Sequence, residues 1–259
     1  MGIVNCTPDS FYPGSRADTR AAAVALARKM IAAGADILDI GGESTRPGSE
    51  PVGAGEEIAR VVPVIEEIRG FSDLPISVDS RKTAVAERAL DCGADIINDV
   101  SAARDDPCMG ALAASRGCAL VLMHMRGTPK TMQKDPFYED TLAEVMAELL
   151  LFVDTAVDAG VDPRKIILDP GIGFAKRLSD NLKLLKYIGS LRQTGHPVLV
   201  GLSRKSFIEK LLDLPVEKRL AASLAAEAFV VINGAEILRV HDVEETVQLV
   251  KMLDAIQAA

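Results

Sequence analysis

The sequence predicts a (β/α)8 barrel, an α/β fold in which each of eight parallel strands is followed by a helix. Eight short apolar runs alternate with helix-patterned stretches along the whole chain, and each run ends on or beside a polar or charged residue. The length of 259 residues is usual for one such barrel. A short motif also recurs at three helix-to-strand boundaries. We therefore expect a single domain over residues 1–259.

The predicted strands are the apolar runs themselves. Parallel strands that are buried on both faces read as nearly continuous apolar segments, without a polar residue at every second position. The runs occupy residues 2–5, 36–41, 76–79, 95–99, 119–124, 166–169, 198–203 and 236–241.

The predicted helices between these runs show apolar residues at helical spacing with charged residues on the opposite face. The clearest lie at 19–33, 55–69, 81–92 and 139–159. The repeated motif reads Gly-Ala-Asp-Ile or Gly-Ala-Glu-Ile and starts at Gly34, Gly93 and Gly234. Glycine adopts the left-handed conformation that ends a helix, so each copy predicts a helix stop followed by a strand.

The polar residues at the ends of the predicted strands are the candidate functional residues. In a (β/α)8 barrel the carboxyl ends of all strands gather on one face, and active sites lie there. We therefore expect nine residues to be near neighbours: Asn5, Asp39, Asp79, Asn98, His124, Asp169, Ser203, Arg239 and His241. The longest loops, at 7–18, 42–52 and 126–138, are expected to serve the same site.

Composition limits the possible partners. The net charge of -8 argues against nucleic acid as a ligand, because such binding depends on basic patches. No apolar run approaches 18 residues, which argues against a membrane span. Four cysteines without paired C-x-x-C spacing favour reduced thiols over structural zinc. With no signal peptide before the first predicted strand, we expect a cytoplasmic protein.

The strand ends carry eight distinctive motifs. They are NCTPDSF from Asn5, GESTRPG from Gly42, SVDS from Ser77, INDV from Ile97, MHMRGTP from Met123, DPGIGF from Asp169, SRKSF from Ser203 and RVHD from Arg239. These motifs resemble those of the dihydropteroate synthase family, and the resemblance covers essentially the whole chain. This family joins 4-aminobenzoate to a dihydropterin pyrophosphate and releases pyrophosphate, a step of folate synthesis. The resemblance implies a Mg²⁺ cofactor and a homodimer formed through the late helices, where 220–232 and 247–256 carry apolar faces.

By resemblance, Asp79, Asn98, Asp169 and Lys205 form the pterin site. A 2-aminopyrimidinone ring presents neighbouring N–H groups, and a buried carboxylate accepts two of them in parallel. Further pterin contacts are assigned to Met123, Phe174 and Gly201. The alternative is that the aspartates only cap the helices that follow them.

The resemblance also implies a diphosphate site at the first and last strand ends, made by Asn5, Thr45, Arg239 and His241. Asn5 is the expected Mg²⁺ ligand, because magnesium prefers oxygen, keeps several waters and often binds through substrate phosphates. We expect Arg239→Ala to slow turnover while leaving the binding of a pterin without diphosphate nearly intact. For His241 a structural hydrogen bond is the alternative.

The expected 4-aminobenzoate site includes two of the long loops, with the loop from Thr7 to Phe11 closing over it. Its residues by resemblance are Thr45, Arg46, Pro47, Phe174, Lys205 and Ser206. A helix start near Ser206 favours the carboxylate. For Phe174 ordinary core packing is the alternative. A direct substrate role for His124 stays open, and His196 is expected to be structural.

The resemblance implies a dissociative mechanism, and no residue stands out as a nucleophile beside a base. Pyrophosphate leaves first, and the amine of 4-aminobenzoate attacks the remaining pterin methylene cation. The sequence therefore assigns catalysis to positioning and electrostatics. The residues assigned to it are Asn5, Asp79, Asn98, Asp169, Lys205, Arg239 and His241.

Three residues depart from the family pattern, and only Pro13 hints at a loss of turnover. Pro13 stands where an acidic residue is common, while Arg177 and Asp180 are expected to affect only packing or capping. A pterin-binding barrel that has lost turnover is one alternative. A methyltetrahydrofolate:corrinoid methyltransferase is another, although it has no need of a diphosphate site. A barrel enzyme of other chemistry is the third.

The sequence makes a direct prediction for Asp169. Asp169→Asn removes a charge-assisted, two-point contact and should weaken pterin binding by on the order of 1.5–3 kcal/mol. Calorimetric titration with a pterin measures this, and an unchanged affinity would contradict the assignment.

Overall fold

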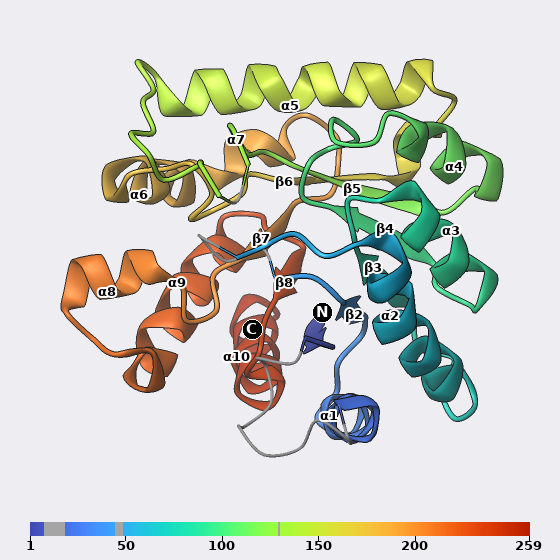
Figure 1. Cartoon of the computed structure of the whole chain (residues 1–259). Coiled ribbons are helices and arrows are strands. Elements are labelled where there is room, and N and C mark those ends of the chain that lie inside the picture. Colours follow the sequence, from blue (N-terminus) through green and yellow to red (C-terminus); the bar gives the residue numbers. More distant parts are fainter. Residues whose placement is uncertain (8–18, 45–48, 129) are drawn as a thin grey trace.

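The computed structural model describes residues 1–7, 19–44, 49–128 and 130–259, without the side chain of Thr19. In this part of the chain, helices surround a core of short strands (Figure 1). The strands are β1 (Gly2–Asn5), β2 (Leu38–Gly41), β3 (Ile76–Asp79), β4 (Ile96–Asp99), β5 (Ala119–Met123), β6 (Ile166–Asp169), β7 (Leu199–Gly201) and β8 (Ile237–Arg239). The α-helices are α1 (Thr19–Ala32), α2 (Ala54–Arg69), α3 (Thr83–Asp91), α4 (Cys108–Arg116), α5 (Thr141–Asp158), α6 (Leu178–Lys186), α7 (Ile188–Arg192), α8 (Ser206–Leu212), α9 (Leu220–Ile232) and α10 (Val243–Gln257), with short 3-10 helices at Pro163–Lys165 and Val216–Lys218.

The strands close into a barrel. β1 to β6 pair in parallel in chain order, and β7 pairs in parallel with β8. Leu168 N–H donates to Pro197 C=O at 2.9 Å, which joins β6 to the start of β7. Val240 N–H donates to Met1 C=O at 3.0 Å, and Ile3 N–H donates to Val240 C=O at 2.9 Å, which joins β8 to β1. The predicted (β/α)8 barrel is therefore confirmed.

Strand alternation decides which side chains reach the barrel interior. Successive strand residues point to opposite faces, so residues two apart share a side. The apolar interior layer contains Ile96, Val121, Ile167 and Leu199, with Ile37 and Ile237 packed against it. Two residues further along the same strands come Asp39, Asn98, Met123, Asp169, Gly201 and Arg239. The mainly polar layer at the carboxyl ends of the strands thus lies next to an apolar layer inside the barrel.

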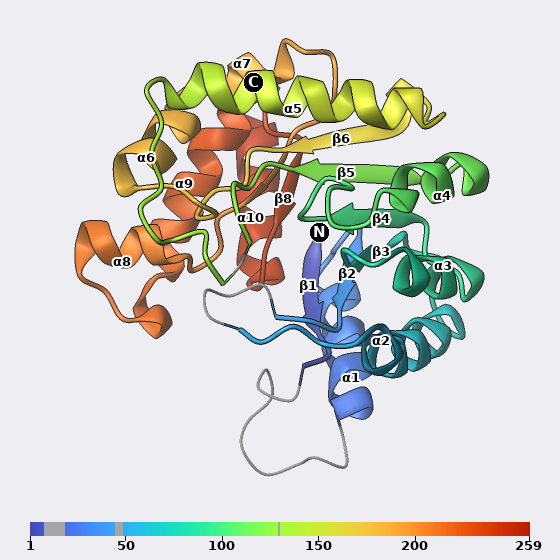
Figure 2. The same cartoon turned by 45° about the horizontal axis from the view of Figure 1, so that its top comes forward.

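The helices agree with the predicted ranges to within two residues at most ends, and α5 lies across β5 and β6 (Figure 2). The three repeat glycines all have positive φ, from 95° to 105°. After Gly34, for example, Ala35 N–H donates to Met30 C=O at 3.0 Å and closes α1. The repeated motif is therefore a helix stop, as predicted.

Gly171 seats the loop after β6 against the end of β5. Its φ is +65°, and its N–H donates to Asp169 Oδ1 at 2.7 Å. A Cβ atom there would lie 2.0 Å from His124 C=O, which is backbone. Only glycine allows this approach.

We predict that Gly171→Ala destabilises the protein well beyond the cost of left-handed strain alone, which is on the order of 1–2 kcal/mol. Gly195→Ala is the matched control, because Gly195 has φ +89° and a Cβ atom there would meet none of the described residues within 4 Å. Urea unfolding measures both variants. Equal losses would show that the contact with His124 is unimportant.

Candidate active site

The barrel mouth is organised around Arg239, whose guanidinium bridges two carboxylates from other strands. Its Nε donates to Asp39 Oδ2 at 2.6 Å, and its Nη2 donates to Asp79 Oδ2 at 2.6 Å. Asn98 Nδ2 donates to Asp39 at 3.3 Å. Asp39 is completely buried, and Asp79 and Asn98 nearly so. One cation from β8 thus holds groups from β2 and β3 together.

Burial and mutual proximity shift the pKa values of these groups. Burial raises the pKa of Asp79 to about 7, against the effect of Arg239. Burial also opposes the charge on Arg239, but Asp39 and Asp79 outweigh it and raise the Arg239 pKa. Burial raises the pKa of Asp169, and the nearby charge of Lys205 opposes this. Perturbed carboxylates gathered at a barrel mouth are typical of an active site.

Lys205 lies on the other side of the mouth, directly before α8. Its Nζ donates to Ile172 C=O at 2.5 Å and lies 4.8 Å from the centre of the Phe174 ring. A Cβ atom at Gly201 would lie 3.6 Å from that Nζ, an ordinary van der Waals distance, so Gly201 borders the ammonium. Burial lowers the Lys205 pKa to about 8. The loop after β6 contacts Lys205 through both a carbonyl and an aromatic ring.

Met123 and Phe174 form an apolar wall beside these charges. Buried Met123 packs in a cluster with Val100, Met125, Met132 and Ala175, and half-buried Phe174 packs against that cluster. Phe174 therefore both packs and borders Lys205, so the two roles considered for it are compatible.

Two of the expected diphosphate residues, Asn5 and Arg239, end β1 and β8, which lie side by side, while Thr45 lies outside the described residues. Asn5 is half-buried. Its Oδ1 and Asp79 Oδ2 lie near the same point, since a Cβ atom added at Gly41 would be 3.8 Å from the first and 3.6 Å from the second. His241 is exposed and its Nδ1 lies 3.1 Å from Ser203 Oγ. An amide oxygen beside carboxylates fits a cation that takes most of its ligands from phosphate and water. The described residues include no group of three or more His, Cys, Asp or Glu able to hold a metal.

The predicted 4-aminobenzoate residues are only partly described. Thr45, Arg46 and Pro47 lie outside the described residues, as does the first-loop segment with Pro13. Ser206 is the exposed first residue of α8.

His124 does not join the other eight strand-end residues, so that expectation was wrong. It follows Met123, which faces the interior, and by strand alternation its imidazole points towards the helices. There its Nε2 lies 3.0 Å from Glu148 Oε2 of α5, and its Nδ1 lies 3.0 Å from Lys176 Nζ.

The sequence placed Asp39 at the barrel mouth without assigning it a contact, and it gave no role to Lys176 or Glu148. Asp39 carried a signal, because it occupies the same strand position as the assigned residues. Lys176 and Glu148 carried none, since a lysine after a loop and a glutamate on an amphipathic helix are ordinary surface residues. The departures at Arg177 and Asp180 cap α6, as expected: Arg177 N–H donates to Asp180 Oδ2 at 2.8 Å.

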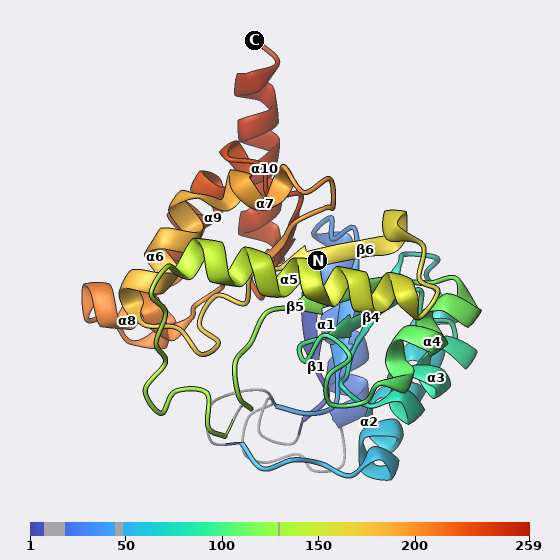
Figure 3. The same ribbon diagram turned by 90° about the horizontal axis from the view of Figure 1, so that it is seen from above.

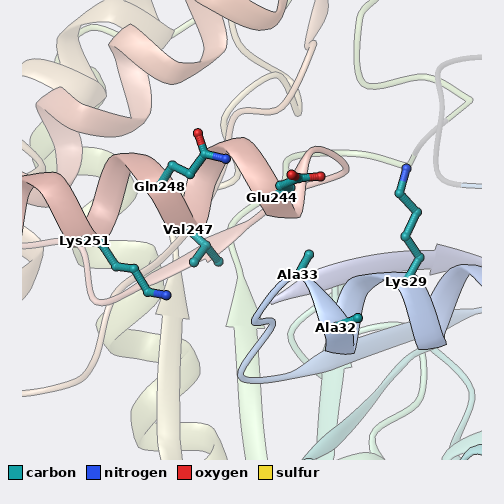
Figure 4. A pocket seen from close by; sticks show the side chains of 7 residues that line it. All are labelled: Lys29, Ala32, Ala33, Glu244, Val247, Gln248 and Lys251. Atoms are coloured by element: carbon teal, nitrogen blue, oxygen red, sulfur yellow. The ribbon is translucent and has the colours of Figure 1, made fainter.

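A hollow elsewhere on the molecule contains none of the predicted site residues. It lies between α1 and α10 (Figure 4) and is lined by Lys29, Ala32, Ala33, Glu244, Val247, Gln248 and Lys251. The polar side chains that line it do not point toward a common centre, so the candidate site remains at the strand ends.

Comparison with known proteins identifies the family. Residues 1–241 match the model of the pterin binding enzyme family. A dihydropteroate synthase of Synechocystis sp. is 46% identical over 257 residues, which cover 99% of this chain and 89% of the relative. That of Bacillus subtilis is 46% identical over 98% of this chain and 87% of the relative. The chain belongs to the dihydropteroate synthase family.

Solved structures of this family share the fold. A Yersinia pestis dihydropteroate synthase with a sulfonamide drug complex superposes with a TM-score of 0.95 at 41% identity, covering 100% of this chain and 94% of that one. A Xanthomonas albilineans enzyme with 4-aminobenzoic acid gives 0.94 at 44% identity, covering 100% and 92%. The same enzyme in complex with 7,8-dihydropteroate gives 0.91 at 42% identity, covering 100% and 93%. The likeness extends over the whole barrel.

The bridging position of Arg239 changes the expectation for Arg239→Ala. Loss of the guanidinium leaves Asp39 and Asp79 buried without their cation, which is costly. Pterin binding should therefore weaken by about tenfold or more, in addition to slower turnover. Calorimetry with a pterin lacking diphosphate tests this. Arg204→Ala is the control, because Arg204 pairs with Asp242 at 2.8 Å. Unchanged pterin affinity in Arg239→Ala would contradict the bridging role.

Proposed function

We propose that the chain condenses 4-aminobenzoate with 6-hydroxymethyl-7,8-dihydropterin pyrophosphate to give 7,8-dihydropteroate and pyrophosphate. The observation that carries this is the set Asp79, Asn98, Asp169 and Lys205 at the barrel mouth of a member of this family, the first three buried and Lys205 half-buried. The complexes of the Xanthomonas albilineans enzyme with 4-aminobenzoic acid and with 7,8-dihydropteroate support both substrate and product.

In this proposal the buried polar groups hold the pterin ring. Asp169 and Asp79 accept its N–H groups, Asn98 both donates and accepts, and Lys205 donates to a ring oxygen or nitrogen. Met123 and Phe174 pack against the ring faces, and Gly201 leaves room for the ring beside Lys205. Fixed carboxylates in a dry site also stabilise positive charge as it develops on the pterin.

The proposed binding site for the pyrophosphate leaving group lies at the carboxyl ends of β1 and β8. The bond between the pterin methylene carbon and the diphosphate oxygen breaks, and the electron pair leaves with pyrophosphate. Arg239 and His241 bind this anion together with Thr45, and Asn5 contributes an amide oxygen to the Mg²⁺ site. When bound, Mg²⁺ supplies positive charge that stabilises the departing pyrophosphate.

The amine of 4-aminobenzoate then attacks the methylene carbon and loses a proton. Ser206 and the backbone at the start of α8 are placed to bind its carboxylate, with Lys205 and Phe174 beside the ring. Thr45, Arg46 and Pro47 complete this site in the proposal. Exclusion of water matters here, because water competes as a nucleophile.

The function is tested by pyrophosphate release from dihydropterin pyrophosphate, with chromatographic detection of dihydropteroate. We expect product only when both substrates and Mg²⁺ are present, and none after chelation. Pterin binding without product would favour the inactive barrel. Methyl transfer from methyltetrahydrofolate to a corrinoid, without dihydropteroate formation, would favour the methyltransferase.

We also propose a cytoplasmic homodimer formed through α9 and α10. Both helices expose large apolar side chains: Phe229, Ile232, Met252 and Ile256 are 46–64% exposed. The end of α10 that carries Met252 and Ile256 extends beyond the neighbouring helices (Figure 3). Four free thiols fit a reducing compartment. The described residues contain no helix long and apolar enough to cross a membrane.

Phe229→Glu should convert the dimer to a monomer in light-scattering chromatography, because it places a charge in a buried apolar interface. Leu151→Glu is the control, since Leu151 is 61% exposed on α5, away from the proposed interface. A monomeric unmodified chain, or a dimer that survives Phe229→Glu, would contradict the proposal.

A further inference from the structure

Lys176 is the largest side chain that the structure buries almost completely, with 1% of its surface exposed. Its Nζ has three acceptors within hydrogen-bond distance. These are Phe174 C=O at 2.9 Å, His124 Nδ1 at 3.0 Å and His124 C=O at 3.3 Å. An ammonium has three N–H donors and satisfies all of them, whereas a neutral amine has two. The surroundings are therefore built for the charged form.

His124 and Glu148 complete this arrangement. With Lys176 donating to Nδ1, the imidazole carries its proton on Nε2 and donates it to Glu148 Oε2 at 3.0 Å. If Lys176 were neutral and accepted a proton from Nδ1, the bare Nε2 of a neutral ring would face a carboxylate. Glu148 is also fixed by Arg126, whose Nε donates to Oε1 at 2.9 Å. The hydrogen-bonded series Lys176–His124–Glu148 therefore favours an ammonium at Lys176, a neutral imidazole protonated on Nε2 and an ionised carboxylate at Glu148.

The ammonium ties the loop after β6 to the end of β5. Phe174 belongs to that loop and His124 follows β5, so one side chain bridges both backbones. The same loop supplies Ile172 C=O, which accepts from Lys205, and the ring beneath the Lys205 ammonium. A shift of the loop would move Lys205 and Phe174 together.

We propose that Lys176, held in its charged form by His124 and Glu148, is a positioning residue that sets the loop carrying Ile172 and Phe174 and so places Lys205 for the pterin. This inference rests on the proposed pterin site. Lys176 acts through Lys205 and Phe174, and its positive charge also favours ionised Asp169.

The charges around Lys176 predict how its pKa changes when Glu148 is neutralised. Burial lowers its pKa to about 7; Asp169 and Glu148 oppose this, while Lys205 and Arg126 add to it. Burial likewise lowers the pKa of His124 to about 4. Loss of the Glu148 carboxylate lowers the Lys176 pKa further, so the ammonium is lost at a lower pH. A defect in pterin binding that results from losing this ammonium must therefore grow as pH rises.

Glu148→Gln and Glu144→Gln form a matched pair. Both residues lie on α5, both side chains are 30% exposed, and both pair with Arg126. Glu148 also contacts His124, at 3.0 Å, whereas Glu144 also accepts from Asp140 N–H at 2.8 Å, at the start of α5. Lys205 and Asp79 also titrate near neutrality, but neither variant alters their contacts, so the difference between the variants reports on Lys176.

We expect Glu148→Gln to raise the KM for dihydropterin pyrophosphate by up to about tenfold at pH 8, with little change at pH 6, as for a fall of one pKa unit in Lys176. The kcat should change less, and Glu144→Gln should match the unmodified chain at every pH. Identical pH profiles for the two variants would overturn the proposal. Absence of product from the unmodified chain would instead overturn the proposed function.

A second readout does not depend on turnover. The chain has three histidines, so selective ¹⁵N-histidine labelling gives a simple spectrum. We expect His124 to show a proton on Nε2 and none on Nδ1 from pH 6 to 8 in the ligand-free protein, and a pterin Kd that rises in Lys176→Met. A proton on Nδ1, or a folded Lys176→Met with unchanged Kd, would overturn the proposal.

Discussion

The bridge from Arg239 to Asp39 and Asp79 is the interaction on which the candidate site depends. It exists only because the barrel closes. Arg239 is the last residue of β8, whereas Asp39 lies within β2 and Asp79 is the last residue of β3. Two carboxylates buried side by side would repel each other and take up protons. A guanidinium between them keeps the mouth polar, ordered and close to charge balance.

The apolar layer below gives this bridge its strength. Ile96, Val121, Ile167 and Leu199 exclude water from the barrel interior, and charges interact more strongly where water is absent. The buried Lys176 and the half-buried Lys205 follow the same principle. Lys205 and Lys176 are both held by backbone carbonyls of the loop after β6, so the position of that loop and the charge of the site are linked. Gly171 sets the loop at the distance from β5 that these contacts require.

Much of this was predictable from periodicity. Eight apolar runs, helix stops at glycine and polar strand ends predict the barrel and the face of its site. The polar strand ends also predict Asp39 at the barrel mouth, and strand alternation could have predicted that His124 faces outward, because it follows Met123, an assigned interior position. The burial of Lys176 could not be predicted. It depends on His124, which supplies two of the three acceptors and meets Lys176 only in the folded chain. The bridge of Arg239 was likewise hidden, since Asp79, assigned to a substrate, turns out to be one of its two partners in the ligand-free protein.

The most direct test of the bridge is a double-mutant cycle of Asp39→Asn and Arg239→Gln, read from the free energy of unfolding. Asp39 is wholly buried and has no proposed contact with substrate, so the cycle isolates the bridge. Asp39→Asn leaves Arg239 with Asp79 as its remaining partner, whereas Arg239→Gln leaves two buried carboxylates without their cation. Breaking a buried pair costs up to about 3–5 kcal/mol. We expect the double variant to be more stable than the sum of the single losses implies, by at least about 1 kcal/mol. Losses that add to within about 0.5 kcal/mol would show that the two groups do not depend on each other.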